Sequence, residues 1–417
     1  MSARSERLAN TGMTIPRSSL ALDNLRAVVI LLVLSFHSVL AYLRFLPPAP
    51  FPFDTPPYAW RAFPIVDAQR WFGFDLYCAW QDVFLMSLFF FLSGLFVWSS
   101  LVRKGTANFL HGRILRLGVP FILVVAILMP PALYPSYLQT ASNPSVAAYW
   151  RHWLALPFWP CGPMWFLWLL LIADFGAAAV HRFAPGISNL LIRLSSAAAA
   201  HPGRYLTGFV LVSALAYVPL ALAFTPAAWF QQGPFAFQLS RPLHYALYFG
   251  AGLCLGAGGD VERGLLAADG PLARHWVLEV IAALVSLLAW MGLTGLTMAE
   301  GASPSVGLQS LADLSFVVAC LASCCAVLGA ALRFMSRRLP SLAGLRDSAY
   351  GMYLVHYLFV VWLQFALIGI ALPALVKGPL VFTGTLCLSW GAVAALRRVP
   401  PFGQIIGAGR AKGAAAS

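Results

Sequence analysis

Charged side chains are scarce in this sequence. Only 10% of its 417 residues are Asp, Glu, Lys or Arg, whereas 60% are hydrophobic. A soluble domain of this length carries many more charges, which keep its surface in water. The scarcity excludes an ordinary soluble enzyme and favours an all-α fold, namely a polytopic membrane protein of about ten transmembrane helices.

Acidic residues are the scarcest charged type: 14 Asp and Glu stand against 27 Lys and Arg, a net charge of +13. In a soluble chain this excess would suggest nucleic acid, but basic residues also collect in the cytoplasmic loops of membrane proteins. With the N-terminus inside, twenty of the 27 basic residues fall in cytoplasmic segments. We therefore expect both termini in the cytoplasm, membrane lipids around the helices, and no nucleic-acid partner.

Cysteine is also sparse, and the seven cysteines do not have the spacing of metal ligands. We therefore predict no metal site. Cys320, Cys324 and Cys325 fall inside an apolar run, where small polarizable residues usually pack. Cys78 and Cys161 fall at the outer ends of predicted helices, where an oxidising compartment would permit a disulfide.

Long polar segments are missing as well, so no separate globular domain is expected outside the membrane. The first apolar run lacks a cleavage site and predicts a retained helix. We expect a cytoplasmic segment at 1–20, a membrane domain at 21–400 and a disordered cytoplasmic tail at 401–417. Apolar runs of spanning length fall at about 25–44, 82–101, 117–134, 163–181, 205–224, 244–260, 275–293, 309–331, 349–370 and 379–396.

The first apolar run contains two residues that a lipid-facing helix would avoid, Arg26 and His37. Eleven residues advance a helix by about 16 Å and return to nearly the same face. Intramembrane ionisable groups usually face an interior cavity. Arg26 alone is also compatible with snorkelling to the headgroups beside Asp23, and His37 with a hydrogen-bonded structural histidine. Together they indicate a polar stripe along one helix.

Two further basic residues, Arg113 and Arg116, follow the second run within HGRILRLGVP and share one predicted helical face. Two guanidiniums in this arrangement suit a phosphate or pyrophosphate. They also fit ordinary topology-determining charges.

The segment DSAYGMYLVH places Tyr350, Tyr353 and His356 three residues apart, on one face of the ninth predicted helix. An interfacial aromatic belt would explain the tyrosines. His356 is about ten residues into that helix, on the order of 15 Å deep, which is too deep for a belt. We expect it to line a cavity.

These elements together resemble the membrane-bound acyltransferase family 3. The resemblance depends on the Arg26–His37 pair, on FFFLSG at 89–94, on Arg113 and Arg116 before the third helix, on GPMWFL at 162–167, and on a late element made of Ser348, Tyr350, Tyr353, Leu354 and His356. It covers nearly the whole chain in the expected order. The opening LDNLRAVVILLVLSFHS is similar to the glucan biosynthesis protein C branch, whose members succinylate periplasmic glucans.

The resemblance implies a multi-pass protein of the bacterial inner membrane that moves an acyl group from cytoplasmic acyl-coenzyme A, with acetyl-coenzyme A as the expected donor, to a carbohydrate or glycolipid hydroxyl outside. No tightly bound cofactor is expected. Arg26, Arg113, Arg116 and Ser348 would bind the donor. His37 would act as general base, or as a nucleophile that forms an acyl-histidine. Arg26, Tyr353 and His356 complete the expected catalytic group, the last two stabilising an oxyanion or orienting the acceptor.

Two other functions are compatible with these residues. A secondary transporter of an organic anion or acylated sugar would also use an intramembrane His–Arg pair, although no internal repeat is visible. An inactive scaffold is the third possibility. The outer loops carry tryptophans that suit either sugar stacking or an interfacial belt: Trp60, Trp71, Trp80, Trp150, Trp153 and Trp159.

Overall fold

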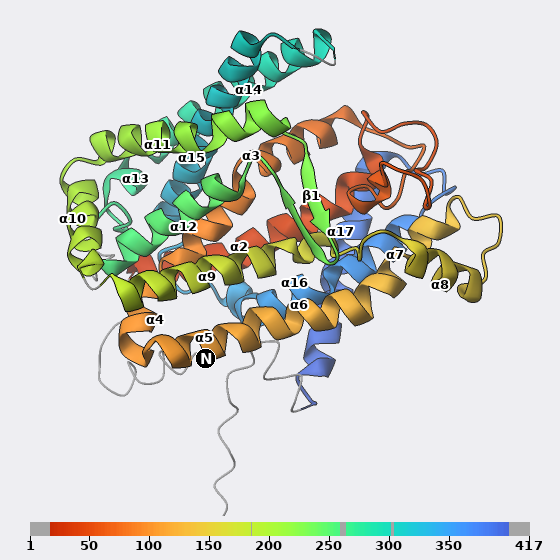
Figure 1. Cartoon of the computed structure of the whole chain (residues 1–417), viewed down its shortest axis with the longest axis horizontal. Helices are drawn as coiled ribbons and strands as arrows, with labels where there is room; N and C mark the ends of the chain where they lie inside the picture. The colour runs from red at the N-terminus through yellow and green to blue at the C-terminus, as the bar shows by residue number, and fades with distance from the viewer. Residues whose placement is uncertain (1–16, 185, 259–263, 302–303, 400–417) are drawn as a thin grey trace, which may run out of the picture.

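The computed structural model describes residues 17–184, 186–258, 264–301 and 304–399. The predicted tail at 401–417 and most of the predicted N-terminal segment lie outside these ranges. The described chain is almost entirely helical (Figure 1). Its main elements are α2 (Arg17–Val39), α3 (Phe72–Gly94), α4 (Val97–Lys104), α5 (Thr106–Arg113), α6 (Val119–Leu123), α7 (Met129–Leu138), α8 (Val146–Ala155), α9 (Trp165–Phe183), α10 (Ile187–Ala200), α11 (Pro202–Phe224), β1 (Trp229–Gln232), β2 (Phe235–Gln238), α12 (Pro242–Ala257), α13 (Pro271–Arg274), α14 (Trp276–Ala299), α15 (Val306–Phe334), α16 (Pro340–Ala366) and α17 (Ala374–Leu396).

Nine helical segments of the described chain are long and apolar enough to cross a membrane. The all-α membrane fold is thereby confirmed. The remaining predicted run, at 244–260, corresponds to α12, which has only 16 residues. α12 packs along α3, and at Gly252 and Gly256 a Cβ would collide with the carbonyl oxygens of Phe91 and Leu95. Small residues on one face let two helices approach closely, so a short helix is accommodated inside the bundle.

Both described ends of the chain lie at the same end of the bundle. Asn24, in the second turn of α2, donates to the carbonyls of Met335 (2.8 Å) and Arg337 (3.0 Å). Arg397, directly after α17, donates to Ser348 Oγ at 3.3 Å. Both contacts therefore lie around the α15–α16 connection. If α12 is counted with the nine spanning segments, the chain crosses the membrane ten times, and an even number of crossings returns it to the side on which it started.

The second spanning helix begins ten residues earlier than its apolar run indicated. α3 starts at Phe72 and includes Asp75, Gln81 and Asp82, which hydropathy had assigned to the preceding loop or to the run's first turn. The polar residues remain helical because the carboxylate of Asp75 accepts from the backbone amides of Arg44 and Phe45, at 2.8 and 3.1 Å. A polar helical turn is therefore added at the outer end.

The third span also extends beyond its prediction, over Thr106–Leu138. Arg113 and Arg116 were expected before this helix and in fact lie inside it, which corrects the sequence-based boundary. Two stretches of π-helix, Ile114–Gly118 and Val124–Leu128, interrupt the α-helical pattern. Wide turns of this kind are frequent at functional sites.

Carbonyls along the third span bond to side chains of other elements. Tyr350 donates to the carbonyl of Arg116, and Trp159 Nε1 to that of Val125 at 2.9 Å, each in one π segment. Trp362 Nε1 donates to the Pro131 carbonyl at 2.9 Å. In a regular helix the Pro131 carbonyl would accept from the backbone amide of residue 135, but Pro135 has no amide hydrogen. The span is therefore joined to α16 at both of its ends.

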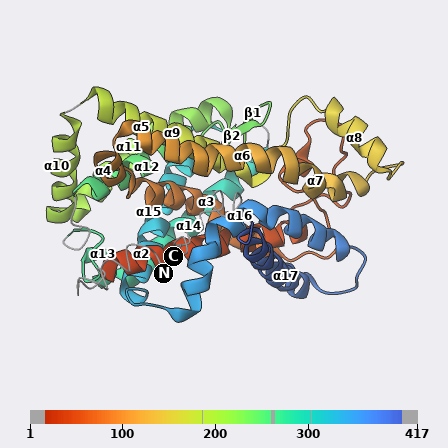
Figure 2. The ribbon, with the colours of Figure 1, turned by 90° about the horizontal axis from the view of Figure 1, so that it is seen from below.

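The bundle has a buried centre and an exposed periphery. The apolar windows of the first span, of α15 and of α16 are 61% buried, whereas that of α14 is 11% buried. α16 packs against α2 and α17, and Figure 2 shows the row of α5, α6 and α7 on the far side of α16. α7 and α8 lie toward one end of the molecule, and α4, α10 and α13 toward the other (Figure 1).

Candidate active site

A cavity of about 510 Å³ opens at the end of the bundle that carries the predicted outer loops. Its wall combines helices, the segment before α3, and the β1–β2 hairpin. Its lining includes Val33, Phe36, His37, Leu40, Tyr58, Arg61, Gln81, Asp82, Leu85, Met86, Phe89, Cys161, Gly162, Pro163, Trp165, Trp229, Gln231, Gln238, Arg241, Tyr245, Tyr353 and Tyr357. Two of the predicted catalytic residues, His37 and Tyr353, thus meet in one concave site.

His37 is oriented by two hydrogen bonds at the same ring nitrogen. Nδ1 is 2.8 Å from the carbonyl oxygen of Val33 and 3.4 Å from His356 Nε2. A carbonyl only accepts, so Nδ1 carries the proton. Nε2 is then unprotonated, and it makes no hydrogen bond to any residue in the described part of the chain. His37 therefore presents a free basic nitrogen in the cavity wall.

His356 is fully buried and has the same tautomer for the same reason. Its Nδ1 is 2.6 Å from the carbonyl oxygen of Tyr353, so this nitrogen is the donor. Its Nε2 is then an acceptor and faces the Nδ1–H of His37. His356 was expected to line a cavity, but it is not among the residues that line this one and lies directly behind His37. Its contact is with His37, which suits an orienting residue.

Tyr353 lines the cavity, and its hydroxyl donates to the carbonyl of Pro163 at 2.6 Å. That bond connects α16 to the GPMWFL segment. Gly162 in this segment has a φ of 51°, and a Cβ there would lie 2.9 Å from Met129 Sδ. Only glycine adopts this conformation readily at such close approach. The segment is therefore held tightly against the third span and α16.

Arg26 lies outside this cavity. Its guanidinium donates to the carbonyl of Leu92 at 3.1 Å, lies 4.0 Å from the ring centre of Phe96 and pairs with Asp23 at 3.7 Å. Along α3, Leu92 is three residues beyond Phe89, the last cavity-lining residue of that helix, roughly 4.5 Å further along the helix. Arg26 and His37 are on one helix, as predicted, but they belong to two separate environments.

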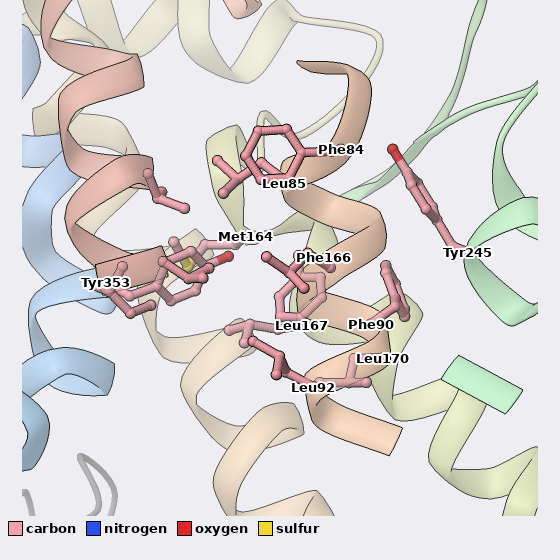
Figure 3. Close-up of a cluster of buried hydrophobic side chains, with 14 of the residues drawn as sticks. Phe84, Leu85, Phe90, Leu92, Met164, Phe166, Leu167, Leu170, Tyr245 and Tyr353 are labelled. Atoms are coloured by element: carbon pink, nitrogen blue, oxygen red, sulfur yellow. The ribbon is translucent and has the colours of Figure 1, made fainter. Parts of the chain in front are cut away.

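A buried apolar cluster extends along α3 from the cavity to Leu92. Figure 3 shows Phe90, Phe166 and Leu167 packed beside α3, with Leu85 toward one end of the cluster and Leu92 toward the other. Phe166 lies 4.8 Å from Phe89 and 5.0 Å from Phe90, measured between ring centres.

The two predicted phosphate-binding arginines have different surroundings. Arg113 pairs with the fully buried Asp174 of α9, its Nε 3.3 Å from the carboxylate. Arg116 is exposed and makes no ion pair with any residue in the described ranges. Lys104 lies close enough to both arginines to be repelled by them. The basic surface that this forms, Arg103, Lys104, Arg113 and Arg116, is rich in unneutralised positive charge.

Ser348, which was predicted to help bind the donor, is buried and accepts from Arg397 at 3.3 Å. It does not line the cavity. The tryptophans of the outer loops also differ among themselves: Trp60 and Trp153 are buried in the aromatic core, whereas Trp71 and Trp150 are exposed. The cavity instead contains Trp165 and Trp229.

Sequence reasoning missed several polar residues of the cavity, among them Gln81, Asp82 and Arg241. Arg241 was counted only as an outer-loop charge, and Asp82 only as the first residue of an apolar run. In the fold they meet: Arg241 Nη2 lies 2.5 Å from Asp82 Oδ2, and Nη1 lies 3.0 Å from Oδ1. The sequence signal that could have revealed this pair was Asp82, a lone acidic residue at the start of a spanning run.

Cys161 also lines the cavity, as a free thiol that is 3% exposed, and Cys78 is a free buried thiol too. Burial raises the pKa of Cys161 to about 12. The thiol is therefore protonated at neutral pH and is a poor nucleophile. Among the described residues, no group of three or more His, Cys, Asp or Glu side chains is arranged to bind a metal ion.

Comparison with known families gives one match. The model described as an acyltransferase domain, of acyltransferase family 3, matches residues 19–394. The match covers most of the chain, from the first helix to the last, and includes every residue of the cavity. Comparisons with curated proteins and with solved structures give no match.

Proposed function

The chain belongs to acyltransferase family 3, and from this membership we propose that it moves an acyl group, acetyl first among the candidates, from cytoplasmic acyl-coenzyme A to a hydroxyl of a carbohydrate outside the bacterial inner membrane. The observation that carries the proposal is the free Nε2 of His37 in the wall of the outer cavity. A neutral imidazole is suited to accept a proton near neutral pH.

The reaction is a direct transfer. Nε2 of His37 takes the proton of the acceptor hydroxyl as its oxygen attacks the thioester carbonyl. The tetrahedral intermediate then breaks its C–S bond, and the departing coenzyme A thiolate takes the proton from the imidazolium. The products are an ester and free coenzyme A. An acyl-histidine formed at the same Nε2 and then attacked by the hydroxyl is the two-step alternative.

His356 supports this step by accepting from the Nδ1–H of His37. The positive charge that develops on the His37 ring is shared over both nitrogens, and acceptors at Nδ1 stabilise it. Here the acceptors are the Val33 carbonyl and a neutral imidazole, not a carboxylate. We therefore propose that His356 orients the ring of His37, and that His37 is the residue that contacts the reacting atoms.

The donor would bind from the opposite end. The exposed guanidinium of Arg116, with Arg113 and Lys104 nearby, suits the phosphates of coenzyme A. Arg26 donates to the Leu92 carbonyl of the apolar cluster and lies near enough to Arg113 to be repelled by it. A position there suits contact with the pantetheine arm on its way to His37.

The test uses the purified full chain in proteoliposomes. Acetyl-coenzyme A, supplied inside or outside the proteoliposomes, should be consumed with release of free thiol. The acetyl group should appear as an ester on an added carbohydrate, detected by mass spectrometry. Thiol release and ester formation should both depend on His37. Flux of an acylated sugar or organic anion without any thioester consumption would instead establish the transporter.

A further inference from the structure

One wall of the cavity is polar and comes from residues that the proposed chemistry does not use. Gln81 and Asp82 are adjacent on α3, and Arg241 is the residue directly before α12. All three line the same cavity as His37. We call these three residues the polar wall.

Gln81 is the least satisfied member of the polar wall. It is fully buried, yet within the described ranges neither its amide nitrogen nor its amide oxygen has a hydrogen-bond partner. The neighbouring Tyr77 hydroxyl lies 2.6 Å from Ser35 Oγ and is also close to the Gln81 amide, but a single hydroxyl satisfies at most one of the two amide groups. A buried amide without partners costs stability unless a ligand supplies the missing bonds. Gln81 offers one donor group and one acceptor to such a ligand.

The charges of the polar wall cancel. Arg241 binds both carboxylate oxygens of Asp82, and Nη1 also lies 3.0 Å from the Asp82 carbonyl oxygen. Arg241 is 5% exposed, whereas the side chain of Asp82 is 47% exposed. The wall therefore presents carboxylate oxygens as acceptors while its net charge is zero. The exposed carboxylate of Asp82 accepts from neutral hydroxyl groups and repels an anion that approaches this wall. The cavity's other guanidinium, Arg61, donates to the carbonyls of Tyr58 and Pro57 and to Gln231 Oε1.

An aromatic surface lies in the same cavity. Trp229 of β1 is 45% exposed and packs edge-on against Trp165, with ring centres 5.8 Å apart. An exposed indole in a concave site gives a flat apolar face for the C–H groups of a sugar ring. The polar wall and Trp229 thus offer the two kinds of contact that a pyranose requires.

We propose that the polar wall and Trp229 form the acceptor subsite, which binds a neutral pyranose by its hydroxyls at Gln81 and Asp82 and by its ring face at Trp229. That the bound sugar is an acyl acceptor rests on the proposed function. Binding of the sugar can be measured without any acyl transfer. Arg241 is a positioning residue, because it holds the Asp82 carboxylate and does not itself contact the sugar.

The experiment measures sugar binding by the full chain in nanodiscs, without acyl-coenzyme A, by saturation-transfer difference NMR. Two probes differ only at C6: methyl β-D-glucopyranoside and the corresponding methyl glucuronide. The wild type should bind the neutral glucoside at least several-fold more tightly than the glucuronide. Gln81→Leu and Trp229→Ala should each weaken glucoside binding roughly 2- to 10-fold, as expected for one hydrogen bond or one aromatic contact.

Asp82→Asn should weaken glucoside binding roughly 10- to 100-fold, because a charge-assisted acceptor is lost. It also leaves Arg241 unneutralised, so the glucuronide should now bind better than it does to the wild type. This reversal distinguishes ligand contact from general damage to the fold. Gln81→Leu keeps all charges and remains informative if the Asp82 variant is unstable.

Matched controls lie outside the cavity: Asp54→Asn, at an exposed carboxylate beside His152, and Trp150→Ala, at an exposed indole of α8. Both should bind the glucoside as the wild type does. Equal binding by the wild type and all three subsite variants, no glucoside binding by the wild type, or equal binding of both probes would overturn the assignment. If acyl-coenzyme A is never consumed while the variants lose sugar binding, the transfer reaction is wrong and the subsite stands.

Discussion

Basic side chains differ in burial and in pairing between the outer half of the molecule and the basic surface at the opposite end. In the outer half, Arg241 is paired with Asp82 at 2.5 Å and Lys377 with Asp67 at 2.7 Å, and both of these basic side chains are almost completely buried. Within the basic surface at the other end, Arg103, Lys104 and Arg116 are exposed, and of its four residues Arg113 alone has an acidic partner in the described chain, Asp174.

The difference has a physical cause. A buried cation is stable only if a counter-ion and hydrogen bonds replace its water, so the outer pairs hold segments of the fold together. Exposed cations keep their water and repel one another, and a polyanionic ligand relieves that repulsion. This difference is the one that the proposed neutral acceptor at the outer end and the proposed anionic donor at the inner end require. The predictions below test that division.

The largest effect is expected at the outer end. His37→Ala should lower kcat by roughly 10²–10⁴-fold, the usual contribution of general base catalysis, and should leave coenzyme A binding unchanged. The measurement is ester formation under saturating donor, together with calorimetric titration of coenzyme A. His152→Ala, which alters an exposed histidine outside the cavity, is the control. A variant that retains more than about a tenth of the wild-type rate would contradict the base assignment.

His356→Ala should lower kcat by up to about 100-fold without changing either KM, because His37 loses its orienting acceptor. A purely structural role would lower the melting temperature and change kcat and KM together. His356→Gln should recover part of the rate, since a side-chain carbonyl oxygen can accept from His37 Nδ1–H in place of the imidazole. No recovery in a well-folded Gln variant would argue against the orienting bond.

At the inner end, Arg116→Ala should raise the KM for acyl-coenzyme A about tenfold and leave kcat near the wild-type value. A lost charge-assisted hydrogen bond costs roughly 1.5–3 kcal/mol, and exposure to solvent reduces this. The measurement is initial rate against donor concentration, repeated at higher salt, where the difference should shrink. Arg193→Ala on α10 is the matched charge control. An equal rise in KM in this variant would show that both arginines serve only membrane topology and do not bind the donor.

The smallest effect is expected at Cys161. Its pKa is raised to about 12 by burial, so at pH 7–9 the thiol stays protonated and the stronger nucleophile, the thiolate, is nearly absent. Cys161→Ala should therefore change kcat less than about twofold. Alkylation of Cys161 by iodoacetamide at pH 8 should also be much slower in the folded chain than in the denatured chain. A large loss of rate would make Cys161, not His37, the candidate acyl carrier.

Several features follow from local pattern alone. Hydropathy identifies nine of the spanning helices and the approximate position of α12, because lipid contact requires about twenty apolar residues in succession. The helical period places Arg26 and His37 on one stripe, and the depth of His356 marks it as an interior residue. The order of motifs indicated acyltransferase family 3, which the family match confirms.

Other features depend on contacts between segments far apart in the chain. The 319-residue separation of His37 and His356 carries no local signal of their 3.4 Å contact. Likewise, Asp82 and Arg241 each match an ordinary pattern by themselves, and their 2.5 Å pairing needs α3 and α12 to pack closely through Gly252 and Gly256. Sequence alone determined which residues are too polar for lipid, since that cost is a property of each side chain. Only the tertiary structure decided which of them meet in one cavity, because a partner's position depends on how whole helices pack.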